Sequence, residues 1–198
     1  NIERRGGAET LVISSFPKKS EWEGKNLKDI SAILKRSIVD TAVEIVLMGS
    51  AGVVSFNMLD EDVEYFMKKP WIMTGSDGSI VMFGQAMPHP RSYGTFPRKI
   101  RSYVLEKKII SMEQAIRAAS GLPAEILGFE DRGLLKEGYV ADVMVFDPSE
   151  IRDKATFTNP HQYSEGIEYL LIRGKTVVER GEFTGTLAGL PLRGKKRN

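Results

Sequence analysis

The sequence predicts an α/β protein built in two parts that meet near residue 130. Over roughly the first 80 residues, short and almost continuously apolar runs alternate with helical patterns, which is typical of parallel strands covered on both faces. From Gly133 onward the pattern changes to short β runs separated by turn residues. With 198 residues, of which 41% are hydrophobic and 27% are charged, the chain has the composition of a globular protein with a buried core.

The elements of the first part follow from apolar spacing and from capping residues. The β-rich run Thr10–Phe16 is expected to form a buried strand that ends before Pro17. Apolar residues at helical spacing after the N-cap Asn26 predict the first helix. Ser111 and Gln114 have the spacing of a capping box at the start of a later helix. The other expected strands lie at 53–56 and 71–74, and the other expected helices at 40–48, 59–69, 99–107 and 112–120.

The second part is expected to consist mainly of β hairpins. Val140–Phe146 is predicted as a strand, and the segment 148–164 as mostly loop. Ile167–Ile172 and Thr176–Glu179 are predicted strands on either side of a turn at Arg173-Gly174-Lys175. Residues 182–184 are expected to add a short last strand.

Charge and composition narrow the chemistry of the chain. The 28 basic and 26 acidic residues leave a net charge of +2, which favours no nucleic-acid partner. No apolar run reaches the roughly 18 residues of a membrane span, and no signal peptide is apparent, so we predict a cytoplasmic protein with no membrane partner. Zinc and iron sites are mostly built from cysteine and histidine, yet the chain has no cysteine and two histidines. Its chemistry must therefore rest on carboxylates, hydroxyls, lysine or arginine, or on residues in another segment.

Asp77 is a candidate site residue because of its position after an apolar run. Side chains at the carboxyl ends of strands line the ligand site in open α/β sheets and in (β/α)8 barrels. The neighbouring Gly75 and Gly78 permit tight or left-handed turns that could direct the carboxylate into a cavity. A Ser-Asp-Gly triplet is more often an ordinary turn or helix cap, and this alternative stays open.

Arg91 lies in the segment 87–98, which contains three prolines, one histidine and two arginines. Because proline fixes φ, we expect a loop that is stiff enough to hold polar side chains in place. A guanidinium can make two parallel hydrogen bonds to a carboxylate-bearing ligand. Pairing with a surface acid is the commoner alternative, for Arg98 as well as Arg91. One imidazole does not make a metal site, so no chemical role is assigned to His89 or to His161.

Two of these motifs resemble those of a known enzyme family. Gly-Ser-Asp-Gly at 75–78, followed by His-Pro-Arg at 89–91 and Gly-Thr-Phe-Pro-Arg at 94–98, is similar to the last barrel strand and following loop of the N-acyl-D-amino-acid deacylases (D-aminoacylases) of the amidohydrolase superfamily. The run from Asp131 to Pro148, with Gly-Tyr-Val-Ala-Asp at 138–142, resembles the return strand of the small amidohydrolase β-sandwich.

The resemblance implies both a fold and an activity. Residues 1–130 would be the C-terminal strands and helices of an amidohydrolase (β/α)8 TIM barrel, and residues 131–198 would be β-sandwich segments. The small-molecule substrate would be an N-acyl-D-amino acid, cleaved to a carboxylate and a free D-amino acid, with zinc as cofactor to polarise the acyl carbonyl and lower the pKa of its bound water. Asp77 matches the aspartate that passes a proton from that water to the leaving nitrogen, and Arg91 matches the arginine that binds the substrate carboxylate.

The same resemblance implies that this chain is one part of an enzyme. The family's zinc ligands come from earlier barrel strands, so we assign no metal ligand here and expect the isolated chain to be inactive. Its partner would be the rest of the barrel, in the same or another chain, and a homo-oligomer is left open. Two other interpretations remain. One is a dihydroorotase- or hydantoinase-like cyclic amidase, and the other is a noncatalytic binding or assembly module.

Overall fold

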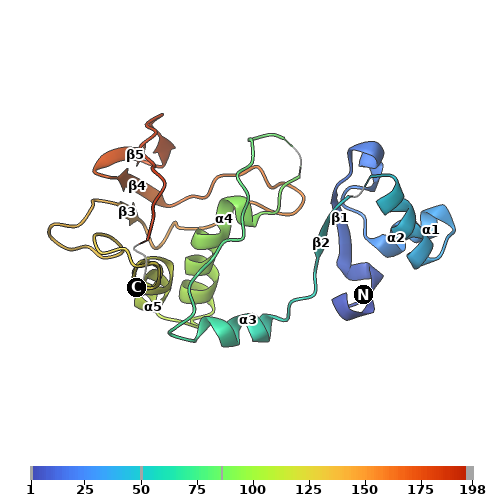
Figure 1. Ribbon diagram of the computed structural model, residues 1–198, viewed down its shortest axis with the longest axis horizontal. Coiled ribbons are helices and arrows are strands. Elements are labelled where there is room, and N and C mark those ends of the chain that lie inside the picture. The colour runs from blue at the N-terminus through green and yellow to red at the C-terminus, as the bar shows by residue number, and fades with distance from the viewer. Residues whose placement is uncertain (1, 50, 86, 195–198) are drawn as a thin grey trace. The chain divides into compact units, whose positions relative to one another are not determined.

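The structure is a computed structural model that describes residues 2–49, 51–85 and 87–194 (Figure 1). The chain divides into two compact units. The first consists of Asn1–Val63, Ser79–Pro90 and Thr156–His161, and the second of Glu64–Gly78, Arg91–Ala155 and Gln162–Asn198. In the part of the chain that the structure describes, no helix has both the length and the apolarity needed to cross a membrane.

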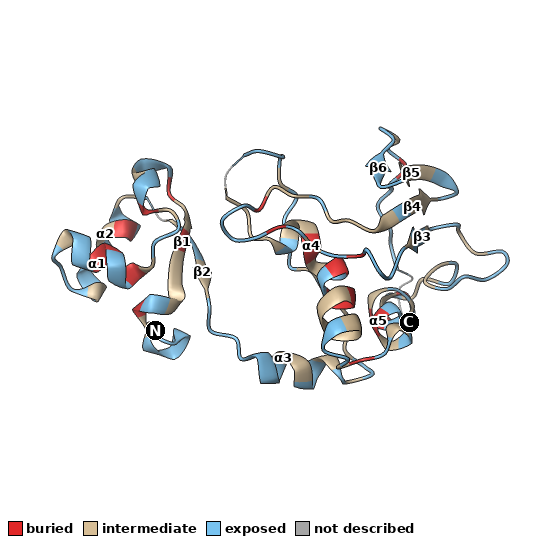
Figure 2. Cartoon of the chain, turned by 180° about the vertical axis from the view of Figure 1, so that it is seen from behind, coloured by how far each residue is buried: buried red, intermediate tan, exposed pale blue. Residues whose placement is uncertain are grey.

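The first unit combines a two-stranded sheet with two helices. Strands β1 (Leu11–Ser15) and β2 (Gly52–Ser55) pair with each other, and helices α1 (Leu27–Leu34) and α2 (Ile38–Leu47) lie between them in the sequence. The unit also contains three short 3-10 turns, η1 (Glu3–Arg5), η2 (Ala8–Thr10) and η3 (Pro17–Trp22). Buried residues from the 3-10 turns, β1, α1 and α2 form its core (Figure 2): Ala8, Ile13, Phe16, Trp22, Leu27, Ile30 and Ile45.

Both helices of this unit begin at side-chain caps. The Asn26 side chain accepts a hydrogen bond from the Asp29 amide at 2.9 Å, which confirms the predicted N-cap of α1. The Ser37 hydroxyl accepts one from the Asp40 amide at 3.1 Å, so α2 begins slightly earlier than its apolar pattern predicted.

The expected parallel sheet of the first 80 residues is not formed. β1 and β2 are antiparallel, with Leu11 opposite Ser55, and the predicted strand 71–74 is not a strand. Apolar runs predict burial, but they do not specify the direction of pairing or the partner strand. Val53 of β2 is 49% exposed, so this strand is not covered on both faces. The Thr74 amide donates to the Ala118 carbonyl at 2.8 Å, at the end of a helix and not on a strand.

The second unit begins with a helical part. Helix α3 (Asp60–Met67) leads into it, followed by α4 (Arg91–Arg98), the π-helix η4 (Lys99–Glu106), α5 (Met112–Ala119) and α6 (Gly121–Leu127). Helices α4 and η4 are continuous, because Arg98 keeps helical dihedral angles. The Ser111 hydroxyl caps α5, whereas the Gln114 side chain donates to the Met67 and Lys68 carbonyls at the end of α3. Only half of the predicted capping box is therefore present.

The expected stiff loop ends at residue 90, since Arg91–Arg98 is the helix α4 with Pro97 inside it. Proline has no amide proton to donate to the carbonyl four residues earlier. That carbonyl belongs to Tyr93, and it accepts a hydrogen bond from the Ser164 hydroxyl at 3.1 Å. Gly94 lets the helix approach Asp153, because a Cβ at position 94 would lie 2.5 Å from the Asp153 Cβ. Distant residues thus accommodate a proline within the helix.

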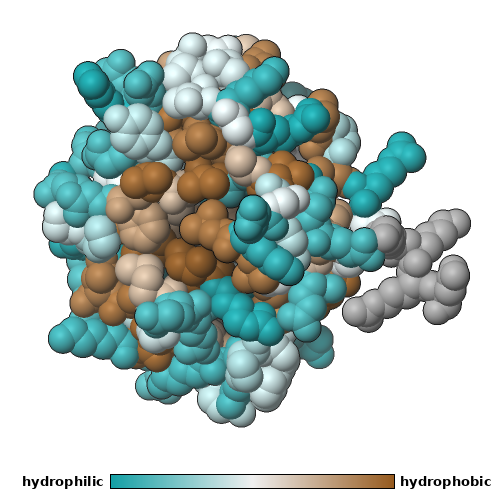
Figure 3. Space-filling model, turned by 90° about the vertical axis from the view of Figure 1, so that its left-hand side faces the viewer, coloured by the Kyte–Doolittle hydropathy of each residue, from teal (hydrophilic) through white to brown (hydrophobic). Residues whose placement is uncertain are grey.

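The remainder of the second unit contains an antiparallel sheet with the strand order β3-β4-β5-β6. Its strands are β3 (Val143–Phe146), β4 (Ile167–Ile172), β5 (Lys175–Glu179) and β6 (Glu182–Phe183), as the sequence predicted to within a few residues. Arg173 and Gly174 both have positive φ, 54° and 73°, as a two-residue type I′ hairpin turn requires. Many apolar side chains remain on the surface of the side that carries this sheet (Figure 3), and exposed apolar residues of the unit include Leu134, Leu135, Leu190 and Leu192.

Candidate functional site

The two predicted site residues, Asp77 and Arg91, contact each other in the second unit. Arg91 Nη2 lies 2.9 Å from Asp77 Oδ2, and the side chains are 42% and 85% exposed. Asp77 belongs to the segment that follows α3, and Arg91 is the first residue of α4. An exposed ion pair of this kind contributes only about 0.2–1 kcal/mol, so either partner can be drawn away by a competing charge.

Asp77 lies in a tight turn with φ of +48°. The neighbouring glycines permit tight or left-handed turns, and here Asp77 itself is left-handed whereas Gly75 and Gly78 do not have positive φ. Aspartate tolerates this region better than most residues because its side chain is short and polar. The Ser76 hydroxyl accepts a hydrogen bond from the Gly78 amide at 3.1 Å. A Cβ on Gly78 would lie 3.2 Å from the Arg91 carbonyl oxygen, so glycine lets the turn lie against the start of α4.

A buried lysine near this turn was not identified from the sequence. Lys99, the first residue of η4, is 9% exposed, and its ammonium donates to the Thr74 hydroxyl at 2.5 Å. Burial lowers the pKa of Lys99. Within the described residues, no carboxylate lies within ion-pair distance of this amine. Nothing in the local sequence Arg-Lys-Ile distinguishes a buried lysine from a solvated one.

The two histidines lie in the first unit and contact aromatic rings. The His89 ring meets the Phe157 ring edge-on at 4.9 Å between centroids, and Phe157 also contacts Phe56. His161 Nδ1 accepts a hydrogen bond from the Gly84 amide at 3.1 Å. These contacts hold both imidazoles against other groups of the first unit.

A metal ion needs several ligands at one place, and the described ranges offer no group of three or more His, Cys, Asp or Glu side chains that could hold one. Asp77 contributes a single carboxylate, and the partner beside it is a cation. The described residues on their own therefore do not fit a zinc site.

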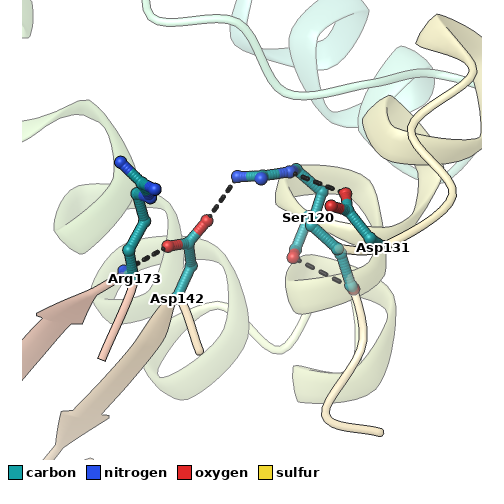
Figure 4. Close-up of polar contacts among 6 residues, drawn as sticks. Ser120, Asp131, Asp142 and Arg173 are labelled. Carbon is teal, nitrogen blue, oxygen red and sulfur yellow. Dashed lines mark hydrogen bonds and ion pairs between the residues drawn. The ribbon is translucent and has the colours of Figure 1, made fainter. Parts of the chain in front are cut away.

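A second polar cluster joins the end of the helical part to the sheet (Figure 4). The Arg132 side chain lies 3.1 Å from Asp131 Oδ1 and 2.7 Å from Asp142 Oδ2. The other Asp142 oxygen accepts a hydrogen bond from the Arg173 amide at the β4–β5 turn, 2.8 Å away. The Ser120 hydroxyl donates to the Gly133 carbonyl at 3.1 Å. Because all these side chains have partners, the cluster is best explained as structural.

Comparisons with known proteins relate most of the chain to one family. A sequence model described as "Amidohydrolase family" matches residues 35–178. An N-acyl-D-aspartate deacylase of Alcaligenes xylosoxydans xylosoxydans is 37% identical over 158 residues, which are 80% of this chain and 31% of the relative.

Solved structures agree with the sequence matches. A crystal structure of D-aminoacylase has a TM-score of 0.81 and 34% identity, covering 94% of this chain and 38% of that one. The N-acyl-D-glutamate deacylase from Bordetella bronchiseptica, complexed with zinc and a phosphonate inhibitor, has a TM-score of 0.78 and 34% identity. This match covers 89% of this chain and 36% of the deacylase chain. The chain thus spans 31% to 38% of the lengths of these relatives.

Proposed function

Because the chain belongs to the amidohydrolase family, we propose that it is the C-terminal part of an enzyme that hydrolyses N-acyl-D-amino acids to a carboxylate and a free D-amino acid. The contact between Asp77 and Arg91 carries this proposal. It joins a carboxylate suited to proton transfer to a guanidinium suited to carboxylate binding. Deacylases of N-acyl-D-amino acids match 80% to 94% of the chain, which supports this substrate class over a cyclic amide.

The proposed architecture follows the same relatives. Residues 1–130 would supply the last strands and helices of a (β/α)8 barrel, and residues 131–198 would supply segments of a β-sandwich. The antiparallel sheet β3–β6 lies entirely within the latter range, which supports this division. Trp71 and Met73 are 67% and 40% exposed. We propose that the rest of the barrel covers these side chains and supplies a strand that pairs with residues 71–74.

Arg91 and Asp77 would act in sequence on the substrate. The substrate carboxylate competes with Asp77 for the Arg91 guanidinium, and two parallel hydrogen bonds make it the stronger partner. Its binding would release Asp77 beside the scissile amide. The freed carboxylate would then accept a proton from the attacking water and return it to the leaving nitrogen. The ion pair would thus hold the free enzyme in a resting arrangement that the substrate itself opens.

Zinc, which the related deacylase structure contains, would polarise the acyl carbonyl when bound. Since the described residues hold no ligand cluster, we propose that the ion is bound by residues elsewhere in the complete enzyme. The contribution of this chain is then proton transfer and substrate binding.

The test is an activity assay on the complete protein that contains these residues, loaded with zinc. We expect release of free D-amino acid from at least one N-acyl-D-amino acid, and no turnover by residues 1–198 alone. The same preparation is assayed with dihydroorotate and a hydantoin. Turnover of the cyclic amides only would favour the alternative amidase, and no turnover of any substrate would favour a noncatalytic module.

A further inference from the structure

We propose that Lys99 is a positioning residue for Asp77, a role that rests on the function proposed above. Lys99 would act on Asp77 indirectly, through Thr74, which precedes Asp77 by three residues in the sequence. Its buried ammonium donates to the Thr74 hydroxyl, and the Thr74 amide is bound to the Ala118 carbonyl. The backbone that enters the Asp77 turn is thereby held between η4 and α5.

The α4–η4 helix holds this segment at two points. Near one end, Arg91 pairs with Asp77, and further along, Lys99 binds Thr74. Thr74 precedes Asp77 in the segment, whereas its partner Lys99 follows Arg91 in the helix. The segment therefore runs along the helix in the opposite direction and is attached to it at both ends.

The two attachments differ in permanence. The Arg91–Asp77 pair is exposed, and in the proposed mechanism it opens when the substrate carboxylate binds Arg91. Lys99 is almost fully buried, and its hydrogen bond to Thr74 stays in place at that moment. After Asp77 leaves Arg91, the Thr74 attachment is therefore what limits the positions that the carboxylate can reach.

Burying the ammonium of a lysine costs free energy, which indicates that Lys99 serves a purpose other than packing. An apolar side chain would fill the same space without desolvating an ammonium. Lys99 also opens a π-helical stretch, in which the Lys107 amide donates to the Ser102 carbonyl five residues earlier. Stretches of π-helix are rare, and those inserted in α-helices occur frequently at functional sites.

The test uses the complete zinc-loaded enzyme and steady-state kinetics with its best N-acyl-D-amino acid. Lys99→Met keeps an unbranched side chain one heavy atom shorter than lysine and removes the ammonium. We expect kcat to fall by about ten- to a hundredfold, the size of effect that a misplaced catalytic group produces. KM should change less than about twofold, because Arg91 still binds the carboxylate. The matched control is Lys107→Met, at the residue directly after η4. The Lys107 amine is exposed and pairs with Glu64, so this substitution should leave both constants unchanged.

A second pair of variants decides the outcome if Lys99→Met does not fold. Thr74→Val removes the hydroxyl that accepts from Lys99 and should lower kcat as Lys99→Met does. Thr74→Ser keeps a hydroxyl at this position and should have the kcat of the wild type. The proposal would be overturned if Thr74→Val had the kcat of the wild type, or if Thr74→Ser lost as much kcat as Thr74→Val. It would also be overturned if Lys99→Met folded, raised KM and left kcat unchanged. Inactivity of the wild type contradicts the proposed function itself, whereas an active wild type with fully active variants contradicts only the role of Lys99.

Discussion

Replacing Asp77 by asparagine separates its proposed role in catalysis from its role in the turn. Asparagine has nearly the same shape and is among the few residues that tolerate a φ of +48°. The substitution removes the ion pair with Arg91, in which the Arg91 side chain is 42% exposed and the Asp77 side chain 85% exposed. Because the pair is exposed, its loss should change the free energy of unfolding by less than about 1 kcal/mol. Loss of a general base and acid should lower kcat by about 10²- to 10⁴-fold.

The assay compares wild type, Asp77→Asn and Asp77→Ala in the complete enzyme, by turnover, bound zinc and thermal unfolding. Alanine should lose activity equally, and it should cost roughly 1–2 kcal/mol more stability, because a left-handed backbone is strained for a residue with an apolar Cβ. Zinc content should be unchanged in both variants. Turnover in Asp77→Asn within threefold of wild type would refute the assignment of Asp77 as the proton-transfer group.

Three further predictions concern substrate binding, packing and pH. Arg91→Ala should raise KM for N-acyl-D-amino acids by about tenfold or more, as expected from the loss of charge-assisted hydrogen bonds, and should leave KM for a cyclic amide unchanged; equal effects on both would argue against carboxylate binding. Gly94→Ala should lower the free energy of unfolding by about 1–3 kcal/mol, because its Cβ would lie 2.5 Å from the Asp153 Cβ, whereas Gly189→Ala, which faces open space, should change it little in denaturant titrations. Hydrogen bonds from the neighbouring lysine and arginine lower the pKa of Glu165 below 4.5, so its stabilising effect is present above that pH and is lost as pH falls through the lowered pKa. Glu165→Gln should therefore have a lower melting temperature than wild type at pH 7, and the difference should shrink as pH falls below 4.5. A difference that stays constant with pH would contradict this linkage.

Local signals in the sequence predicted local structure well. The Asn26 cap, the strand Ile167–Ile172 and the Arg173-Gly174 turn depend on residues within a few positions of one another, and the structure has all three. The direction of strand pairing in the first unit was predicted wrongly. Pairing depends on a partner strand, about which an apolar run carries no information.

The candidate site was predictable only in part. Asp77 and Arg91 were selected from their positions in the sequence, and a motif resemblance supplied their expected roles. The structure places them in contact, while their chemical roles remain predictions. Lys99 was missed because burial of a lysine is decided by the elements packed around it, here through Thr74 and η4. The helix from Arg91 was missed because Pro97 is a strong local signal against helix, and its compensation comes from a distant residue.

That compensation has a consequence for how related sequences should vary. An ordinary residue at position 97 would donate its own amide to the Tyr93 carbonyl, and the Ser164 hydroxyl would then no longer be needed to satisfy that acceptor. Proline at position 97 and a hydroxyl at position 164 should therefore be gained and lost together during divergence. In an alignment of homologues, the two columns should covary although they lie in segments far apart in the chain.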